Sequence, residues 1–163
     1  KEYYRIFTSA LIHRDPMHLI FNMLTYYFFA IELVRQVGNI RFVIIYVFSL
    51  IASEITTLIK HRDNPTYYGL GASGAISGIL FASILYVIHI PGARVLIFFV
   101  LPIPVWLFPI LFVVFSIWAA RRLNDNVAHE VHLFGALAGL VITLVLDPMS
   151  GPRLLQWISM QFS

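Results

Sequence analysis

Residues 69–90 have the sequence GLGASGAISGILFASILYVIHI, a glycine-rich entry followed by an apolar run without Asp, Glu, Lys or Arg. An uncharged apolar stretch of about 18 residues or more is typical of a membrane-spanning helix. Gly69, Gly71 and Gly74 surround Ser73 at the point where this run begins. We therefore predict a membrane helix over residues 73–90 with a serine at its start.

The remaining sequence has the same apolar character. Of its 163 residues 60% are hydrophobic and 12% are charged, whereas soluble domains carry about 25% charged residues. A soluble domain of this size exposes too much surface to hide so many apolar side chains, and a disordered chain would have far fewer of them. The absence of cysteine excludes disulfides and thiolate chemistry. The eleven Lys and Arg form no basic stripe, so no nucleic-acid partner is expected.

Further apolar segments predict an all-α, polytopic membrane helix bundle with five visible transmembrane helices. Asp15-Pro16 is a typical helix start, and Asp147-Pro148 is a typical stop. Two prolines make residues 94–104 an expected interfacial segment, and Trp157 is a candidate interfacial anchor in the tail. The predicted helices are 16–37, 40–59, 73–90, 104–120 and 127–146, in a transmembrane domain over 1–149 with an interfacial tail at 150–163.

Polar side chains gather at one end of this bundle. Short connections make successive helices antiparallel, so the helices that start near residues 16, 73 and 127 begin at the same membrane face. Polar residues at membrane depth are functional candidates. Those at the shared end are His18, Asn22, Ser73, Ser77, His129, Glu130 and His132.

Ser73 and His132 form a candidate catalytic pair. A serine hydroxyl becomes an effective nucleophile when a neighbouring base takes its proton. Gly74 and Gly78 on one helix, and Gly135 and Gly139 on another, would let the two helices approach closely. The alternative for a lone serine among glycines is a helix-packing residue.

Two other motifs point to a dinucleotide site and to a zinc site; the first is rejected and the second is disfavoured. Gly69, Gly71 and Gly74 match the dinucleotide fingerprint, but no strand precedes them and a membrane helix follows. His129 and His132 are one residue closer than the two histidines of a helical zinc motif, and no third ligand is obvious. We therefore expect no cofactor and no metal.

His18 and Asn22 are four residues apart and share one helix face. Both can donate hydrogen bonds to an oxyanion, with the Ser73 backbone N–H as a further donor. The alternative is a polar pair that ties this helix to a neighbour.

These residues resemble motifs of the rhomboid family of intramembrane serine proteases over about residues 1–147. His18 to Asn22 resembles H-x-x-x-N, Gly71 to Gly74 resembles G-x-S-G, and His132 to Gly139 resembles H-x-x-G-x-x-x-G. Tyr3-Tyr4-Arg5 resembles the aromatic-Arg motif of the first external loop.

The resemblance implies an intramembrane serine endopeptidase with a serine–histidine dyad and no acid. Ser73 would be the nucleophile and His132 the general base, with His18, Asn22 and the Ser73 N–H as oxyanion hole. Gly71, Gly74, Gly135, Gly139 and His13 would have supporting roles. The substrates would be transmembrane segments of other proteins in the lipid bilayer.

The family comparison also gives expectations about topology. A sixth helix would lie upstream of residue 1, and the active-site end would be extracytoplasmic. Seven Lys and Arg lie at that end against four at the other, so the positive-inside rule favours the opposite orientation. Ser77 stands where several family members carry an aromatic residue that packs on the histidine.

Three other functions remain open at this stage. A catalytically inactive rhomboid-like protein would bind transmembrane helices and need no dyad. A small transporter would place polar residues at both ends of its helices, whereas here they gather at one end. A zinc metalloprotease would use His129 and His132.

Overall fold

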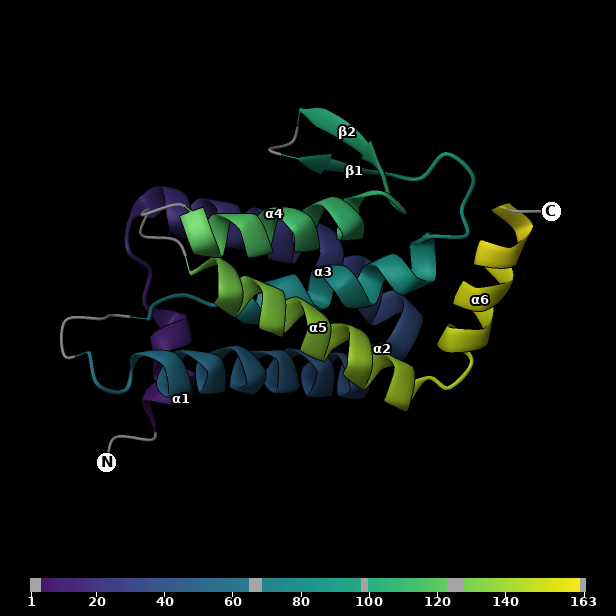
Figure 1. Ribbon diagram of the computed structural model, residues 1–163. Helices are drawn as coiled ribbons and strands as arrows, with labels where there is room; N and C mark the ends of the chain where they lie inside the picture. Colours follow the sequence, from purple (N-terminus) through teal and green to yellow (C-terminus); the bar gives the residue numbers. More distant parts are fainter. Residues whose placement is uncertain (1–3, 65–68, 98–99, 123–127, 162–163) are drawn as a thin grey trace.

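In the computed structural model, residues 4–64, 69–97, 100–122 and 128–161 are described. Helices dominate the fold, and a short β-hairpin projects beside them (Figure 1). The first elements are α1 (Arg5–Thr8), the 3-10 turn η1 (Ser9–Leu11) and α2 (Pro16–His61). They are followed by α3 (Ser73–Val87), β1 (Arg94–Ile97), β2 (Leu101–Pro104), α4 (Phe108–Arg122), α5 (His129–Leu146) and α6 (Ser150–Gln161).

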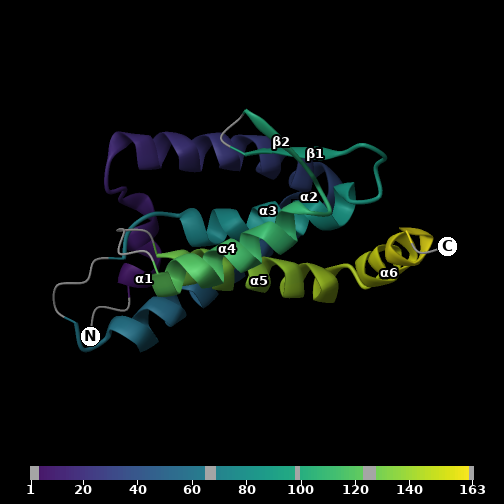
Figure 2. The ribbon, with the colours of Figure 1, turned by 45° about the horizontal axis from the view of Figure 1, so that its top comes forward.

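Helix α2 contains two of the predicted segments, joined at Gly38. Its 46 residues would extend about 69 Å as one straight helix, roughly twice the thickness of a bilayer core. Gly38 interrupts it with φ +79° and ψ 166°, a conformation that glycine adopts readily because it has no Cβ. The chain reverses direction there, so the two halves of α2 run in opposite directions (Figures 1 and 2).

Helix α3 is the central element. Every residue from Gly74 to Tyr86 is buried, and α2 and α5 pack against it. Two apolar clusters surround it: one joins Leu33, Ile45 and Ile79, and the other joins Phe81, Ile84 and Phe108. A helix that is apolar on all sides is typical of a protein core or a membrane span, and here the neighbouring helices enclose it.

The segment between α3 and α4 is more regular than predicted. Residues 94–97 and 101–104 form two antiparallel strands in which Arg94 is paired with Pro104 and Leu96 with Pro102. Val95 is buried while its neighbours are exposed, the alternation of a strand with one covered face. The two prolines, which lack an N–H, lie in the second strand of this two-stranded sheet. The predicted helix start at residue 104 is therefore wrong, and α4 begins at Phe108.

The other predicted helices are confirmed with small changes at their ends. Helix α3 ends at Val87 instead of residue 90, and the tail forms α6. The predicted start of the last spanning helix at Val127, and residue Tyr3 of the aromatic-Arg motif, lie outside the described residues. Among the described helices, α2 and α5 are long and apolar enough to cross a membrane, and α3 is a shorter apolar helix.

Candidate active site

Ser73 and His132 lie together although 59 residues separate them in the sequence. Oγ of Ser73 is the first hydroxyl of α3, and Nε2 of His132, in the first turn of α5, lies 2.7 Å from it. With the ring proton on Nδ1, the serine O–H donates to Nε2. This is the geometry in which a histidine can accept the proton of a serine nucleophile.

Glycines on facing helices bring the two side chains within reach. A Cβ on Gly135 would overlap the backbone of Gly74, and one on Gly139 would overlap the backbone of Gly78. On the other side of α3, the same Gly74 and Gly78 face Ser53 and Ser49 of α2. Close approach of this kind is what small residues permit between membrane helices. Gly135 and Gly139 therefore set the distance between α3 and α5 at the level of the pair, and Gly74 and Gly78 allow α2 to approach α3.

The loop before Ser73 is held by η1. Gly71 has φ +103°, and its N–H donates to the carbonyl oxygen of Ser9 at 3.0 Å. A Cβ at Gly71 would lie 2.6 Å from Cε1 of His18 and 3.5 Å from Nδ2 of Asn22. Both the backbone conformation and the close contact require glycine at this position.

His18 and Asn22 approach the same loop from α2. The Asp15 carboxylate caps α2 by accepting a hydrogen bond from the His18 N–H at 2.8 Å. This hydrogen bond, together with one from the Arg14 side chain, holds the pKa of Asp15 below its usual value. Asn22 is buried, and its Nδ2 finds no hydrogen-bond partner among the described residues. The His13 ring meets the His18 ring edge-on at 5.3 Å. A buried amide donor without a partner is ready to bind an acceptor that enters the site.

Residues beside the pair have other partners. Ser77 donates to the Ser73 carbonyl oxygen at 2.8 Å and so remains bonded to its own helix. The ring of His129 is buried and packs edge-on against Phe115 at 5.6 Å. In the described part of the chain, no three His, Cys, Asp or Glu side chains group as metal ligands do.

The Glu130 side chain is engaged by cationic groups at the end of α2. Its carboxylate pairs with the Lys60 ammonium and lies 3.7 Å from Nε2 of His61. The sequence contained no signal for this contact, because the partners are 70 residues apart and on different helices. The sequence also contained no signal for the role of Ser9, because the group that binds the Gly71 N–H is its backbone carbonyl, which any residue could supply.

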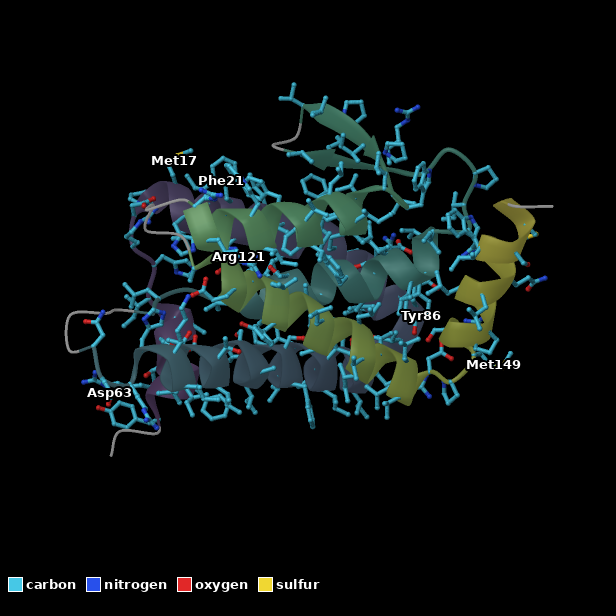
Figure 3. The ribbon with its side chains drawn as sticks, in the orientation of Figure 1. Met17, Phe21, Asp63, Tyr86, Arg121 and Met149 are labelled. Atoms are coloured by element: carbon cyan, nitrogen blue, oxygen red, sulfur yellow. The ribbon has the colours of Figure 1, made fainter. Side chains whose placement is uncertain are left out.

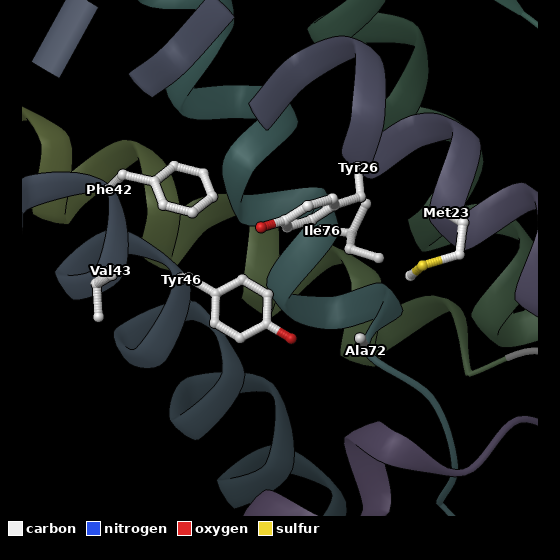
Figure 4. A pocket seen from close by; sticks show the side chains of 7 residues that line it. All are labelled: Met23, Tyr26, Phe42, Val43, Tyr46, Ala72 and Ile76. Atoms are coloured by element: carbon white, nitrogen blue, oxygen red, sulfur yellow. The ribbon is translucent and has the colours of Figure 1, made fainter. Parts of the chain in front are cut away.

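A cavity of about 400 Å³ borders the loop before Ser73 (Figure 4). It lies between the halves of α2 and the start of α3, and Tyr26, Tyr46, Ala72 and Ile76 are among its walls. The rings of Tyr26 and Tyr46 meet edge-on at 6.4 Å. This space is mostly apolar and is lined by neither Ser73 nor His132.

The fold and the site together define a helical membrane protein with a serine–histidine pair at the start of a buried helix. The family profile described as the rhomboid domain matches residues 1–148, and the chain belongs to the rhomboid family.

Relatives in this family differ in their named activity. RHOMBOID-like protein 12, mitochondrial, of Arabidopsis thaliana is 28% identical over 151 residues, which is 83% of this chain and 44% of that protein. Rhomboid protease AarA of Providencia stuartii is 32% identical over 101 residues, 55% of this chain and 36% of the relative. Inactive rhomboid protein 1 of Drosophila melanogaster is 30% identical over 79 residues, 47% of this chain and 5% of the relative. The chain thus spans less than half the length of these relatives.

Proposed function

We propose that this protein is an intramembrane serine endopeptidase that cleaves transmembrane segments of other membrane proteins. The observation that carries the proposal is the 2.7 Å contact between Ser73 Oγ and His132 Nε2. One named relative is a rhomboid protease. A Ser73 hydroxyl without a histidine partner would have favoured the alternative of a catalytically inactive protein that binds transmembrane helices. One relative is named an inactive rhomboid protein.

The proposed reaction is acyl transfer. Ser73 Oγ attacks the peptide carbonyl carbon while His132 Nε2 takes the hydroxyl proton, and a tetrahedral oxyanion forms. His132 then gives the proton to the leaving amine as the C–N bond breaks, which leaves an acyl ester on Ser73. Water attacks this ester, with His132 again as base, and releases the second product.

The proposed oxyanion hole consists of Asn22, His18 and the Ser73 N–H. The unpaired amide of Asn22 supports this role, because it is a buried donor next to Gly71, two residues before the nucleophile. The first N–H groups of a helix have no acceptor within that helix, so the amide at the start of α3 is available for the oxyanion. Donors fixed before the reaction stabilise developing charge most effectively.

The short length of α3 supports cleavage within the membrane. Its 15 residues extend about 22 Å, less than the hydrocarbon thickness of about 30 Å. A helix of that length starts below the membrane surface if its other end reaches the opposite interface. Ser73 would then lie below the membrane surface at the depth of a substrate helix, and hydrolysis would require water to reach it from the extracytoplasmic face.

Labelling with a fluorophosphonate tests the proposal in detergent-solubilised full-length protein. Wild type should be labelled, whereas Ser73→Ala and His132→Ala should not. Ser77→Ala is the matched control, since its hydroxyl lies on the same helix but bonds to the Ser73 carbonyl; it should be labelled like wild type. Wild type that is folded but unlabelled would refute an activated serine and favour the inactive, helix-binding alternative.

A further inference from the structure

A second hollow lies at the end of the bundle opposite Ser73. It has a volume of about 480 Å³ and is bounded by the connection from α3 to β1, the connection from β2 to α4, and one face of α6. Figure 3 shows Tyr86 and Met149 near α6 at this end, and Asp63 and Arg121 at the other. We call this hollow the hairpin pocket.

The walls of the hairpin pocket combine apolar side chains with one arginine and one histidine. Ile88 and Val105 are buried and form its apolar part, while Trp106 is 47% exposed. Arg94 and His89 also line it and are exposed. The lining residues include no acid, and no acidic side chain in the described part of the chain pairs with Arg94. The pocket therefore favours an anion with an attached apolar group.

The frame of the pocket is fixed by backbone hydrogen bonds. The Ile90 N–H donates to Val87 O at 3.0 Å, and the Ala93 N–H donates to Ile90 O at 3.1 Å. The Val105 N–H then donates to Ala93 O at 3.0 Å, which ties the two connections together. A site whose backbone is already ordered loses less entropy when a ligand binds.

The α6 wall is held by a polar cluster around Asp147. Tyr86 Oη donates to the Asp147 carboxylate at 3.1 Å, and Arg153 Nη1 lies 3.4 Å from the same oxygen. The Ser150 hydroxyl donates to the Asp147 carbonyl oxygen at 2.7 Å. These contacts fix the start of α6, which carries the pocket residues Trp157 and Met160. They also direct the Asp147 carboxylate toward Tyr86 and Arg153, neither of which lines the pocket.

We propose that the hairpin pocket binds the phosphate of an anionic glycerophospholipid. The phosphate would bind Arg94 and His89, and the glycerol and upper acyl chains would lie on Trp106 and Trp157. Basic pockets among transmembrane helices bind anionic headgroups in this way, and tryptophan is enriched at the depth of the headgroups. The exposed apolar side chains of the hairpin, Leu96 and Leu101, continue the surface toward the lipid tails.

Quenching of tryptophan fluorescence by brominated lipids tests this proposal without any need for catalysis. The full-length protein with Trp118→Phe keeps only Trp106 and Trp157 within the 163 residues. It is placed in phosphatidylcholine vesicles with rising fractions of brominated phosphatidylglycerol, or of brominated phosphatidylcholine. The anionic lipid should quench at the lower mole fraction. Arg94→Gln should lower its relative affinity about fivefold, the value of one interfacial cation, and Arg94→Lys should retain most of it.

Arg41→Gln is the matched control. Arg41 is an exposed cation next to the turn at Gly38, at the same end of the bundle, but it does not line the pocket. It should leave the preference for the anionic lipid unchanged. Equal loss in the Arg41 and Arg94 variants, or no preference in wild type, would overturn the proposal. Relief of quenching by inorganic phosphate alone would assign the pocket to free phosphate instead of a lipid.

Discussion

Gly135 of α5 lies directly against the backbone of Gly74 of α3. Gly135 comes three residues after His132, and Gly74 comes one residue after Ser73. A methyl group on Gly135 would push α3 and α5 apart at the level of the Ser73–His132 pair, whereas one on Gly74 would collide mainly with Ser53 of α2. The separation that makes the 2.7 Å contact possible is therefore set by residues that carry no functional group.

Gly135→Ala should abolish fluorophosphonate labelling and lower the melting temperature. The added Cβ meets backbone, which cannot rotate away, and overpacking costs about 1–3 kcal/mol. Gly151→Ala is the control, since its Cβ would meet only Leu144 at 3.6 Å; it should label normally. Normal labelling of Gly135→Ala would show that α3 and α5 need no such contact.

Gly71→Ala should reduce labelling because it combines backbone strain with a collision against His18. A non-glycine residue in an unfavourable backbone region costs about 1–3 kcal/mol. Gly38→Ala separates the two causes, because Gly38 also has positive φ but no atom within 4 Å of a Cβ. Gly38→Ala should lower the melting temperature with a smaller change in the labelling rate. Equal labelling rates in the two variants would remove the contact with His18 as a cause.

Asn22→Ala should slow cleavage of a transmembrane substrate by about 10²–10³-fold without lowering the melting temperature. The amide is buried and unpaired among the described residues, so its removal also relieves the free-energy cost of an unsatisfied donor. Cleavage rate and thermal unfolding should be measured on the same preparation. A large loss of stability with an unchanged rate would assign Asn22 a structural role.

Reversing the charge of Lys60 or of Glu130 alone should lower the thermal stability, and reversing both should restore it. Lys60→Glu or Glu130→Lys places like charges together, and the double variant rebuilds the pair with a coupling energy of up to about 1 kcal/mol. Thermal unfolding at low and high salt measures it, and salt should weaken the coupling. Arg62→Glu is the control, because Arg62 pairs with Asp63 instead. A double variant as unstable as the sum of the single ones would refute the contact.

Acid should weaken the start of α2 through Asp15. Its pKa is lowered in the folded protein, chiefly by the His18 N–H and also by Arg14. The stabilisation by this carboxylate is therefore complete above its pKa in the unfolded chain and is lost as the pH falls through its folded pKa. Asp15→Asn keeps a capping oxygen without the charge, so its melting temperature should depend less on pH in this acidic range. An unchanged pH dependence would exclude Asp15 as its source.

The position of α3 and the polar end of the bundle could be predicted because they follow from local patterns. The apolar run that follows Ser73 is continuous in the sequence and long enough for a membrane helix. The helix start at Asp15 and Pro16 is also a signal between neighbouring residues. The hairpin over 94–104 could not be predicted in this way, since two prolines in an apolar segment indicate only that a helix is interrupted. Its strand pairing became visible only with the register of Arg94 and Pro104.

The sequence by itself determined the membrane helix bundle, its rhomboid motifs and the residues that can carry serine chemistry, because hydropathy and spacing act along the chain. Only the tertiary structure decided that Ser73 meets His132, that Asn22 faces Gly71, and that Lys60 pairs with Glu130. These contacts join residues that are 49 to 70 positions apart. They depend on where helices cross, which is set by the fit of glycines, serines and backbone at the helix interfaces.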